Sequence, residues 1–252
     1  MASRLENLIQ MLLEEQELTQ VVIPEAVAEQ EQLYRALQNV RYPVPAQADF
    51  LYQQDRYLQE KLLEKGVVSL ADMSPVSPNL YLWQGDITRL AVDAIVNAAN
   101  SKLLGCFVPN HRCIDNAIHT AAGLQLRLAC HQLMLEQGAD EPTGQAKITP
   151  AYNLPAKYVL HTVGPIIYDQ VKDLERTQLR SCYQACLELA VANGLTSIAF
   201  CCISTGEFRF PQSEAAQLAI ETVKDFLKSH ENLQVVFNVF KDEDLELYQA
   251  YL

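Results

Sequence analysis

Hydrophobic residues recur at helical spacing in the first part of the chain. In residues 3–15 five apolar side chains fall on one face of a helix: Leu5, Leu8, Ile9, Leu12 and Leu13. Residues 25–38 and 48–65 are also predicted to be helical, and prolines between them break the pattern. We therefore predict an N-terminal helical extension over residues 1–74, with a linker at 69–80 that leads into a second region.

From about residue 75 onward, short apolar runs alternate with longer amphipathic segments. The predicted strands are residues 80–87, 93–99, 146–152, 158–163, 197–204 and 233–240. The predicted helices are residues 114–137, 174–194 and 211–229. Apolar strands that alternate with helices are typical of an α/β fold, in which helices cover both faces of a mostly parallel sheet.

Ligands of such sheets bind beyond the carboxyl ends of the strands. Three stretches of the chain are predicted to meet at that edge. They are the asparagine turn (97–100) with the Cys/His loop that follows it (105–113), the stretch "CCISTGEFRFP" (201–211), and "NVFKDED" (238–244). The functional site is therefore expected at this edge.

Charge and cysteine content narrow the class of protein. The chain has 19 Lys and Arg against 31 Asp and Glu, a formal net charge of −12, which argues against nucleic acid or an anionic membrane as the main partner. The N-terminal segment contains acids and no unbroken apolar run, so we expect neither a signal peptide nor a membrane span. Seven cysteines without a leader indicate free thiols and a cytoplasmic protein.

A strand, a glycine-containing loop and a helix follow one another in "ISTGEFRFPQSEAAQ" (203–217). The loop Ser204-Thr205-Gly206 and the start of the helix present free backbone N–H groups, which suit a phosphate. The signal is weak by itself, because many α/β turns contain these residues. Arg209 either pairs with phosphate or is solvated.

Two further residues are predicted to stand at the same edge. Asp86 ends the first strand of the sheet, where an acid is more often a cap than a ligand contact, although it can also accept hydrogen bonds from a base. Phe240 ends the last strand and either stacks on a base or belongs to the core.

The asparagine turn and the Cys/His loop contain the most distinctive chemistry. Buried amides need partners; for Asn97 we favour a structural bond to the neighbouring loop, and Asn100 can bind a ribose hydroxyl. Cys106, His111 and Cys113 are the ligand types that zinc prefers. Three protein ligands leave an open position, which is typical of catalytic zinc.

Two other residues, Asp115 and His119, are the candidates that would close this position and make the metal structural. Without a metal, the same pattern corresponds to two half-buried thiols and a surface histidine. From the spacing alone, both interpretations stay open.

The combination of "GDITRLAVDAIVNAANSKLLG" (85–105), "ISTGEFRFP" (203–211) and "VVFNVFKDED" (235–244) resembles a macrodomain, the ADP-ribose-binding fold. The resemblance covers roughly residues 75–252 and implies a three-layer α/β/α domain with a mixed, mostly parallel sheet. Most macrodomains have a glycine-rich loop where this chain has the Cys/His loop. That variant resembles the zinc-dependent subgroup of bacterial and fungal protein-ADP-ribose hydrolases, which also bear an N-terminal helical extension.

The resemblance implies a role for each candidate residue. Asp86 would accept the adenine amino group beside the Ile87 N–H, and Phe240 would stack on the adenine. Asn100 would hold the distal ribose. The backbone of five residues would wrap the diphosphate: Ser204, Thr205, Gly206, Glu207 and Phe208. Arg209 stands where many macrodomains have glycine. With Asn100, the zinc ligands Cys106, His111 and Cys113 would form the catalytic set next to that ribose.

The function implied is a zinc-dependent hydrolase that removes mono-ADP-ribose from modified proteins. Zinc can activate a bound water or polarise the substrate, and an acid-linked ester is favoured because a carboxylate leaving group needs little acid assistance. Alternatives are a non-catalytic ADP-ribose-binding module and an O-acetyl-ADP-ribose deacetylase. Relatives of this subgroup often share operons with a sirtuin-type transferase and a lipoyl-carrier protein, which is the expected modified partner. We expect a monomer.

Overall fold

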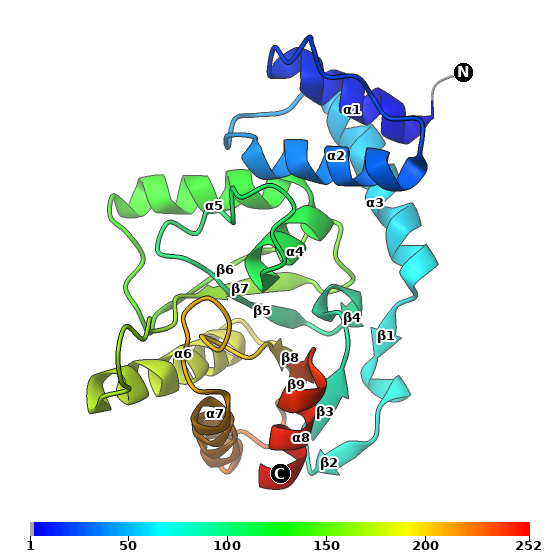
Figure 1. Cartoon of the computed structure of the whole chain (residues 1–252). Coiled ribbons are helices and arrows are strands. Elements are labelled where there is room, and N and C mark those ends of the chain that lie inside the picture. The colour runs from blue at the N-terminus through cyan, green and yellow to red at the C-terminus, as the bar shows by residue number, and fades with distance from the viewer. Residues whose placement is uncertain (1–2) are drawn as a thin grey trace.

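A seven-stranded sheet forms the centre of the protein (Figure 1), whose computed structural model describes residues 3–252. The strands lie in the order β2 (Pro75–Ser77), β3 (Leu80–Gln84), β9 (Gln234–Val239), β8 (Ser197–Phe200), β5 (Ala94–Ala98), β7 (Tyr158–Thr162) and β6 (Ala146–Pro150). The five inner strands are parallel, while β2 and β6 pair antiparallel at the two edges. The predicted mixed, mostly parallel sheet is confirmed.

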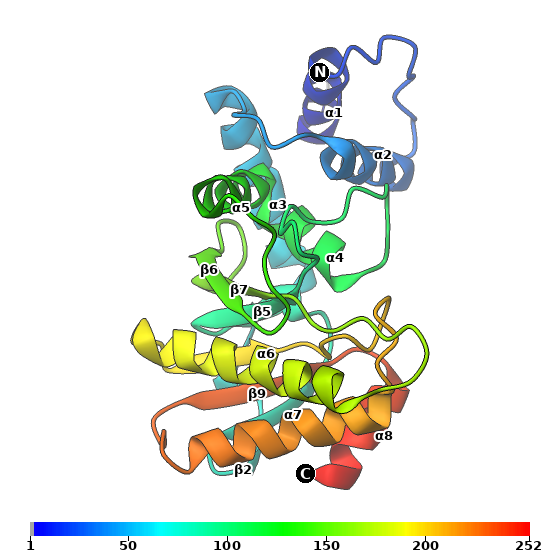
Figure 2. The same cartoon turned by 90° about the vertical axis from the view of Figure 1, so that its left-hand side faces the viewer.

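Helices flank this sheet on both sides (Figures 1 and 2). On one side, α6 (Asp173–Ala192) contacts β6 and β7 and packs beside α7 (Gln212–Leu227), which contacts α8 (Asp242–Tyr251). On the other side lie α4 (Ile114–Ala122) and α5 (Leu124–Gln137). Of the described helices, none is long and apolar enough to cross a membrane.

The single helix predicted over residues 114–137 is wrong, because the chain breaks at Gly123. Gly123 has a φ of +93°, a conformation that favours glycine, and it ends α4 and precedes α5. A Cβ there would stand 2.7 Å from Gln54 Nε2 of the N-terminal region. Apolar spacing alone does not reveal such a break.

The N-terminal extension consists of α1 (Arg4–Glu15), α2 (Val27–Val40) and α3 (Ala48–Lys65), close to the predicted ranges. Ser3 and Glu6 cap the start of α1 reciprocally. The apolar faces of the three helices form a core of their own, to which the macrodomain-like region contributes Leu124 of α5. The extension is therefore stacked mainly on α4 and α5, as Figure 1 shows, and it is a distinct layer of the protein.

The predicted linker at 69–80 contains regular structure. Val68–Ser69 forms β1, which pairs in parallel with β4 (Leu90–Ala91), and Leu70–Asp72 forms one 3₁₀ turn. Residues Pro75–Ser77 form β2 and add to the edge of the main sheet.

Asp93, which directly precedes β5, connects this strand to β8. Its Oδ2 accepts hydrogen bonds from the N–H groups of Thr196 and Ser197 and from Thr196 Oγ1, and Lys157 Nζ lies 2.7 Å from Oδ1. Burial opposes ionisation, but the bonds from Lys157 and Thr196 outweigh it and lower the pKa of Asp93 to about 2.

We expect Asp93→Asn to lower the free energy of unfolding by about 2 kcal/mol at neutral pH, since each pKa unit corresponds to about 1.4 kcal/mol. The folded-state pKa is depressed, so this contribution is present above the unfolded pKa of about 4 and is lost as pH falls through about 2. Urea unfolding of both proteins at neutral pH and near pH 2 measures it. Equal differences at the two pH values would contradict this account.

Candidate functional site

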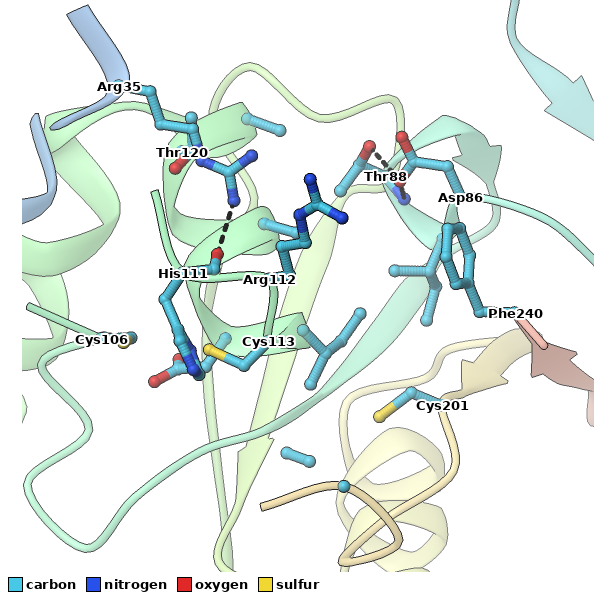
Figure 3. A pocket seen from close by; sticks show the side chains of 18 of the residues that line it. Arg35, Asp86, Thr88, Cys106, His111, Arg112, Cys113, Thr120, Cys201 and Phe240 are labelled. Carbon is cyan, nitrogen blue, oxygen red and sulfur yellow. Dashed lines mark hydrogen bonds between the residues drawn. The ribbon is translucent and has the colours of Figure 1, made fainter. Parts of the chain in front are cut away.

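A cleft of about 1560 Å³ lies at the carboxyl edge of the inner strands. The predicted adenine, diphosphate, ribose and metal residues all line it, and so do residues of the N-terminal helices: Ala28, Glu31, Gln32, Tyr34, Arg35, Tyr57, Leu58, Lys61, Leu62 and Lys65. Figure 3 shows the Cys/His loop at one end and Asp86 with Phe240 at the other. The helical extension therefore forms one wall of the site, although its helices have a hydrophobic core of their own.

Asp86 stands at the end of β3 and is both a cap and a cleft residue. Its Oδ1 accepts hydrogen bonds from Thr88 N at 3.0 Å and Thr88 Oγ1 at 2.6 Å, which starts the 3₁₀ turn Ile87–Arg89. Lys65 Nζ of α3 lies 3.2 Å from Oδ2. Burial opposes ionisation, but Thr88 and the Lys65 charge outweigh it, so the pKa of Asp86 lies below its usual value. A carboxylate therefore faces the cleft at neutral pH.

Phe240 follows β9 beside Asp86 (Figure 3). Its side chain is 74% exposed, so the alternative of a core phenylalanine is wrong. An exposed aromatic ring next to a carboxylate provides a stacking surface and an acceptor for a purine base. Ile87, by contrast, is buried and can offer only its backbone N–H.

The loop Ser204–Phe208 contains a row of unused backbone donors. In the part of the chain that the structure describes, none of these five N–H groups donates a hydrogen bond. The loop is held instead by its carbonyl groups, because Ser204 O accepts from Phe210 N at 2.9 Å and Phe208 O accepts from Ile167 N at 2.8 Å. Successive free N–H groups form an anion-binding surface.

Ser204 and Arg209 give this loop its sharp turns. Both have left-handed backbone conformations, with φ values of +66° and +60°. Ser204 is 5% exposed, and a Cβ on Gly164 would stand 2.0 Å from its Oγ, so only glycine fits beside the loop at that position.

The two asparagines of the turn have different partners. Asn97 is fully buried and donates from Nδ2 to Asp115 Oδ1 at 2.8 Å, the structural bond favoured from the sequence. Asn100 donates to Gly105 O at 3.1 Å and accepts from Lys102 N at 3.0 Å. Asn100 lines the cleft, and its amide shapes the turn that leads to the Cys/His loop.

Cys106, His111 and Cys113 lie together, with one potential ligand atom of each within 4.8 Å of the others. All three side chains are half-buried. His111 Nδ1 is buried and has no hydrogen-bond partner among the described residues, and His111 Nε2 lies 3.5 Å from Glu207 Oε1. Glu207 therefore connects the diphosphate-type loop to the Cys/His loop.

This donor set fits zinc, which binds thiolates and imidazole nitrogens. Cys113 caps α4, and its Sγ accepts from Asn116 N at 3.4 Å. Burial and the neighbouring Cys106 raise the pKa of Cys113 to about 12, so the thiol is protonated unless a cation compensates the thiolate. One bound cation would satisfy both the orphaned ring nitrogen of His111 and the two neighbouring thiols.

The two residues that could have closed the metal site, Asp115 and His119, are not part of the Cys106–His111–Cys113 group. Asp115 bonds to Asn97 and lies 3.5 Å from His119 Nε2. Burial raises the pKa of Asp115 to about 6. Three candidate ligands thus remain at the loop.

A second group of possible ligands, His119, Cys130 and His161, is fully buried. Both ring nitrogens of His161 already have neighbours: Nδ1 lies 3.2 Å from Asn97 Nδ2 and Nε2 lies 2.9 Å from Thr149 Oγ1. Burial lowers the pKa of His161 to about 3, so the ring is neutral. His161 and Cys130 therefore belong to a buried polar network, whereas both ring nitrogens of His119 have no hydrogen-bond partner among the described residues.

Several basic residues line the cleft and were not assigned to it from the sequence: Arg35, Lys61, Lys65, Lys102, Arg112 and Lys241. Lys65 lies beside Asp86, Arg35 reaches the Cys/His loop, and Figure 3 places Arg112 between Cys113 and Asp86. Arg112 is exposed and lies inside the Cys/His loop, so its position in the motif was the only available signal. Lys65 and Arg35 belong to the helical extension, and no local pattern connects them to the cleft.

Fold and cleft together define an α/β protein with a polar ligand site at the carboxyl edge of its sheet. The macro domain model matches residues 96–219. A protein-ADP-ribose hydrolase of Treponema medium is 54% identical over 237 residues, 92% of this chain and 91% of that protein. One of Staphylococcus aureus (strain MRSA252) is 50% identical over 251 residues, 98% and 94% of the two chains. The crystal structure of the Trypanosoma brucei macrodomain in complex with ADP-ribose superposes with a TM-score of 0.66 at 30% identity, covering 85% and 94%. The chain belongs to the macro domain family.

Proposed function

We propose that this protein is a zinc-dependent hydrolase that releases mono-ADP-ribose from modified proteins. The observation that supports it most is the Cys106–His111–Cys113 group at one end of a cleft whose other end offers Asp86 and Phe240. The two bacterial relatives are named protein-ADP-ribose hydrolases. A pure binding module gives no reason for two thiols and an orphaned imidazole nitrogen beside the ribose end.

The cleft suits the parts of ADP-ribose in sequence. Asp86 accepts the adenine amino group, the Ile87 N–H lies beside it, and Phe240 stacks on the ring. The free N–H groups of Ser204–Phe208 donate to the diphosphate. The distal ribose then lies near Asn100 and the Cys/His loop, which brings its anomeric carbon to the metal-ligating residues.

Cys106, His111 and Cys113 would hold the zinc ion, which would supply Lewis acidity at the distal ribose. Glu207 orients the His111 ring through its contact with Nε2. Asn100 fixes the turn and hydrogen-bonds the ribose. The backbone donors of Ser204–Phe208 hold the diphosphate, so that the reacting bond is positioned by binding energy made elsewhere on the ligand.

An ester to an acidic side chain is the proposed linkage. Its carboxylate leaving group needs little protonation. A lipoyl-carrier protein is the proposed modified partner, and the protein is proposed to act as a monomer.

The decisive test offers an acid-linked ADP-ribosyl protein to the purified protein, with and without a chelator, while bound metal is quantified. We expect near-stoichiometric zinc and release of ADP-ribose that stops on metal removal and returns with zinc. Release that persists after complete metal removal would overturn the metal requirement. Tight ADP-ribose binding without release would indicate a reader, and turnover of O-acetyl-ADP-ribose alone would indicate the small-molecule deacetylase.

A further inference from the structure

The N-terminal helices contact the Cys/His loop directly, although the bonded residues are 71 and 76 positions apart in sequence. All of these bonds come from α2, whose carboxyl-terminal half lies next to the loop and α4. The extension therefore does more than stack on α4 and α5.

Arg35 of α2 makes the most extensive of these contacts (Figure 3). Its Nη2 donates to the His111 carbonyl oxygen at 2.8 Å, and Nε and Nη2 donate to Asn116 Oδ1 at 3.0 and 2.7 Å. Asn116 donates from Nδ2 to Val108 O at 3.2 Å and from its backbone N to Cys113 Sγ at 3.4 Å. One arginine thus fixes the backbone of His111 and, through Asn116, the approach to Cys113.

Asn39, one turn further along α2, holds the middle of the loop. Its Oδ1 accepts a hydrogen bond from Asn110 N at 2.9 Å, and its Nδ2 donates to Thr120 Oγ1 at 3.2 Å. Asn110 has a left-handed conformation with a φ of +56°, which few L residues adopt. The bond from Asn39 stabilises this turn immediately before His111.

Phe107 fixes the first half of the loop. The Arg127 guanidinium lies 4.3 Å from the centre of its ring, and the Tyr42 ring lies 6.1 Å away on the segment after α2. Arg127 Nη1 also donates to the last carbonyl groups of α2 and the residue after it: Gln38, Asn39 and Arg41. The end of α2 and the loop are therefore joined through one buried arginine.

The loop itself has little internal support. Within residues 105–113 the structure describes one backbone hydrogen bond, from His111 N to Val108 O at 3.2 Å. A loop with so few bonds of its own takes its shape from its neighbours, and here the neighbours are Arg35, Asn39 and Arg127.

We propose that α2 is part of the metal centre, with Arg35 and Asn39 as positioning residues that hold Cys106, His111 and Cys113 at ligating distance. The inference rests on the proposed function only in taking these three residues as metal ligands. Hydrogen bonds around the ligands of a metal site typically change its metal affinity about 10- to 100-fold.

The test compares Arg35→Gln with Arg4→Gln in the full chain. Arg4 is the matched control, because it pairs with Glu60 inside the helical extension. Co²⁺ binding is titrated by its thiolate absorption, Zn²⁺ affinity is measured by chelator competition, and hydrogen–deuterium exchange of residues 105–116 is recorded on metal-free protein. ADP-ribose binding to metal-free protein is measured by calorimetry.

We expect Arg35→Gln to weaken both metals about ten-fold, to alter the Co²⁺ spectrum and to raise exchange in the loop, while Arg4→Gln changes none of these. Unchanged metal affinity and loop exchange in Arg35→Gln would overturn the proposal. If the wild-type protein binds no metal, the proposed zinc-dependent activity is wrong. The hydrogen–deuterium exchange of residues 105–116 in the two variants then shows whether α2 positions the loop. Should Arg35→Gln not fold, Asn39→Ala serves for the same comparison.

Discussion

Cys113→Ser is expected to reduce the rate of ADP-ribose release about 10²- to 10³-fold while ADP-ribose still binds. A metal ion contributes several kcal/mol of charge stabilisation at a reacting centre, and about 1.4 kcal/mol corresponds to ten-fold in rate. Serine is the informative replacement, because Cys113 is the N-cap of α4 and serine is a strong N-cap residue. The variant keeps the helix start and loses a soft ligand. Single-turnover release from an acid-linked ADP-ribosyl protein gives the rate, and calorimetry gives the affinity.

Cys186→Ala is the control for loss of a thiol, since Cys186 is buried on α6, away from the cleft. This variant should be somewhat less stable, but it should bind zinc and release ADP-ribose as the wild-type protein does. Release by Cys113→Ser at the wild-type rate would remove the thiol from the chemistry. Loss of ADP-ribose affinity equal to the loss of rate would instead assign Cys113 to binding.

The sheet and its functional edge could be predicted because each strand is a short apolar run with local boundaries. Parallel strands of alternating α/β type bring their carboxyl ends to one edge, so Asp86, the Ser204 loop and Phe240 had to converge. The Cys/His loop was predictable for a similar reason, because its three side chains lie within eight residues of one another.

The contributions of the N-terminal helices could not be predicted, because they depend on side-chain contacts between residues 21 to 98 positions apart. The apolar face of α1 indicates that the helix is packed, but it does not identify the elements that the helix packs against. In the structure the three N-terminal helices form a layer on α4 and α5. Polar residues make that joint: Gln54 bonds Gln125, and Asp55 accepts from Asn153. Hydrophobic periodicity does not identify such polar contacts.

The second prediction concerns the adenine end, where Asp86→Asn should raise the Kd for ADP-ribose about 10- to 100-fold. Hydrogen bonds to charged groups contribute about 1.5–3 kcal/mol, and 1.4 kcal/mol corresponds to ten-fold in Kd. Two donations from Thr88 would hold the asparagine oxygen in the place of Oδ1. The amide nitrogen, a donor, then takes the place of the acceptor Oδ2. It faces two other donors, Lys65 Nζ and the adenine amino group, and can accept from neither. Because the cap of the 3₁₀ turn is kept, the variant should fold normally, and a change in Kd then reports on binding alone.

Calorimetry on metal-free protein measures this change without interference from turnover. Asp242→Asn is the matched control, because Asp242 accepts from Gln84 Nε2 at 2.7 Å just beyond Phe240. Because the pKa of Asp86 is lowered, the wild-type affinity should be constant between about pH 5 and 8 and decline only below about pH 4, where the carboxylate protonates. An unchanged Kd in Asp86→Asn would mean that adenine is held by the Phe240 ring and the Ile87 N–H alone. A decline that begins near neutral pH would place the titrating group elsewhere in the cleft.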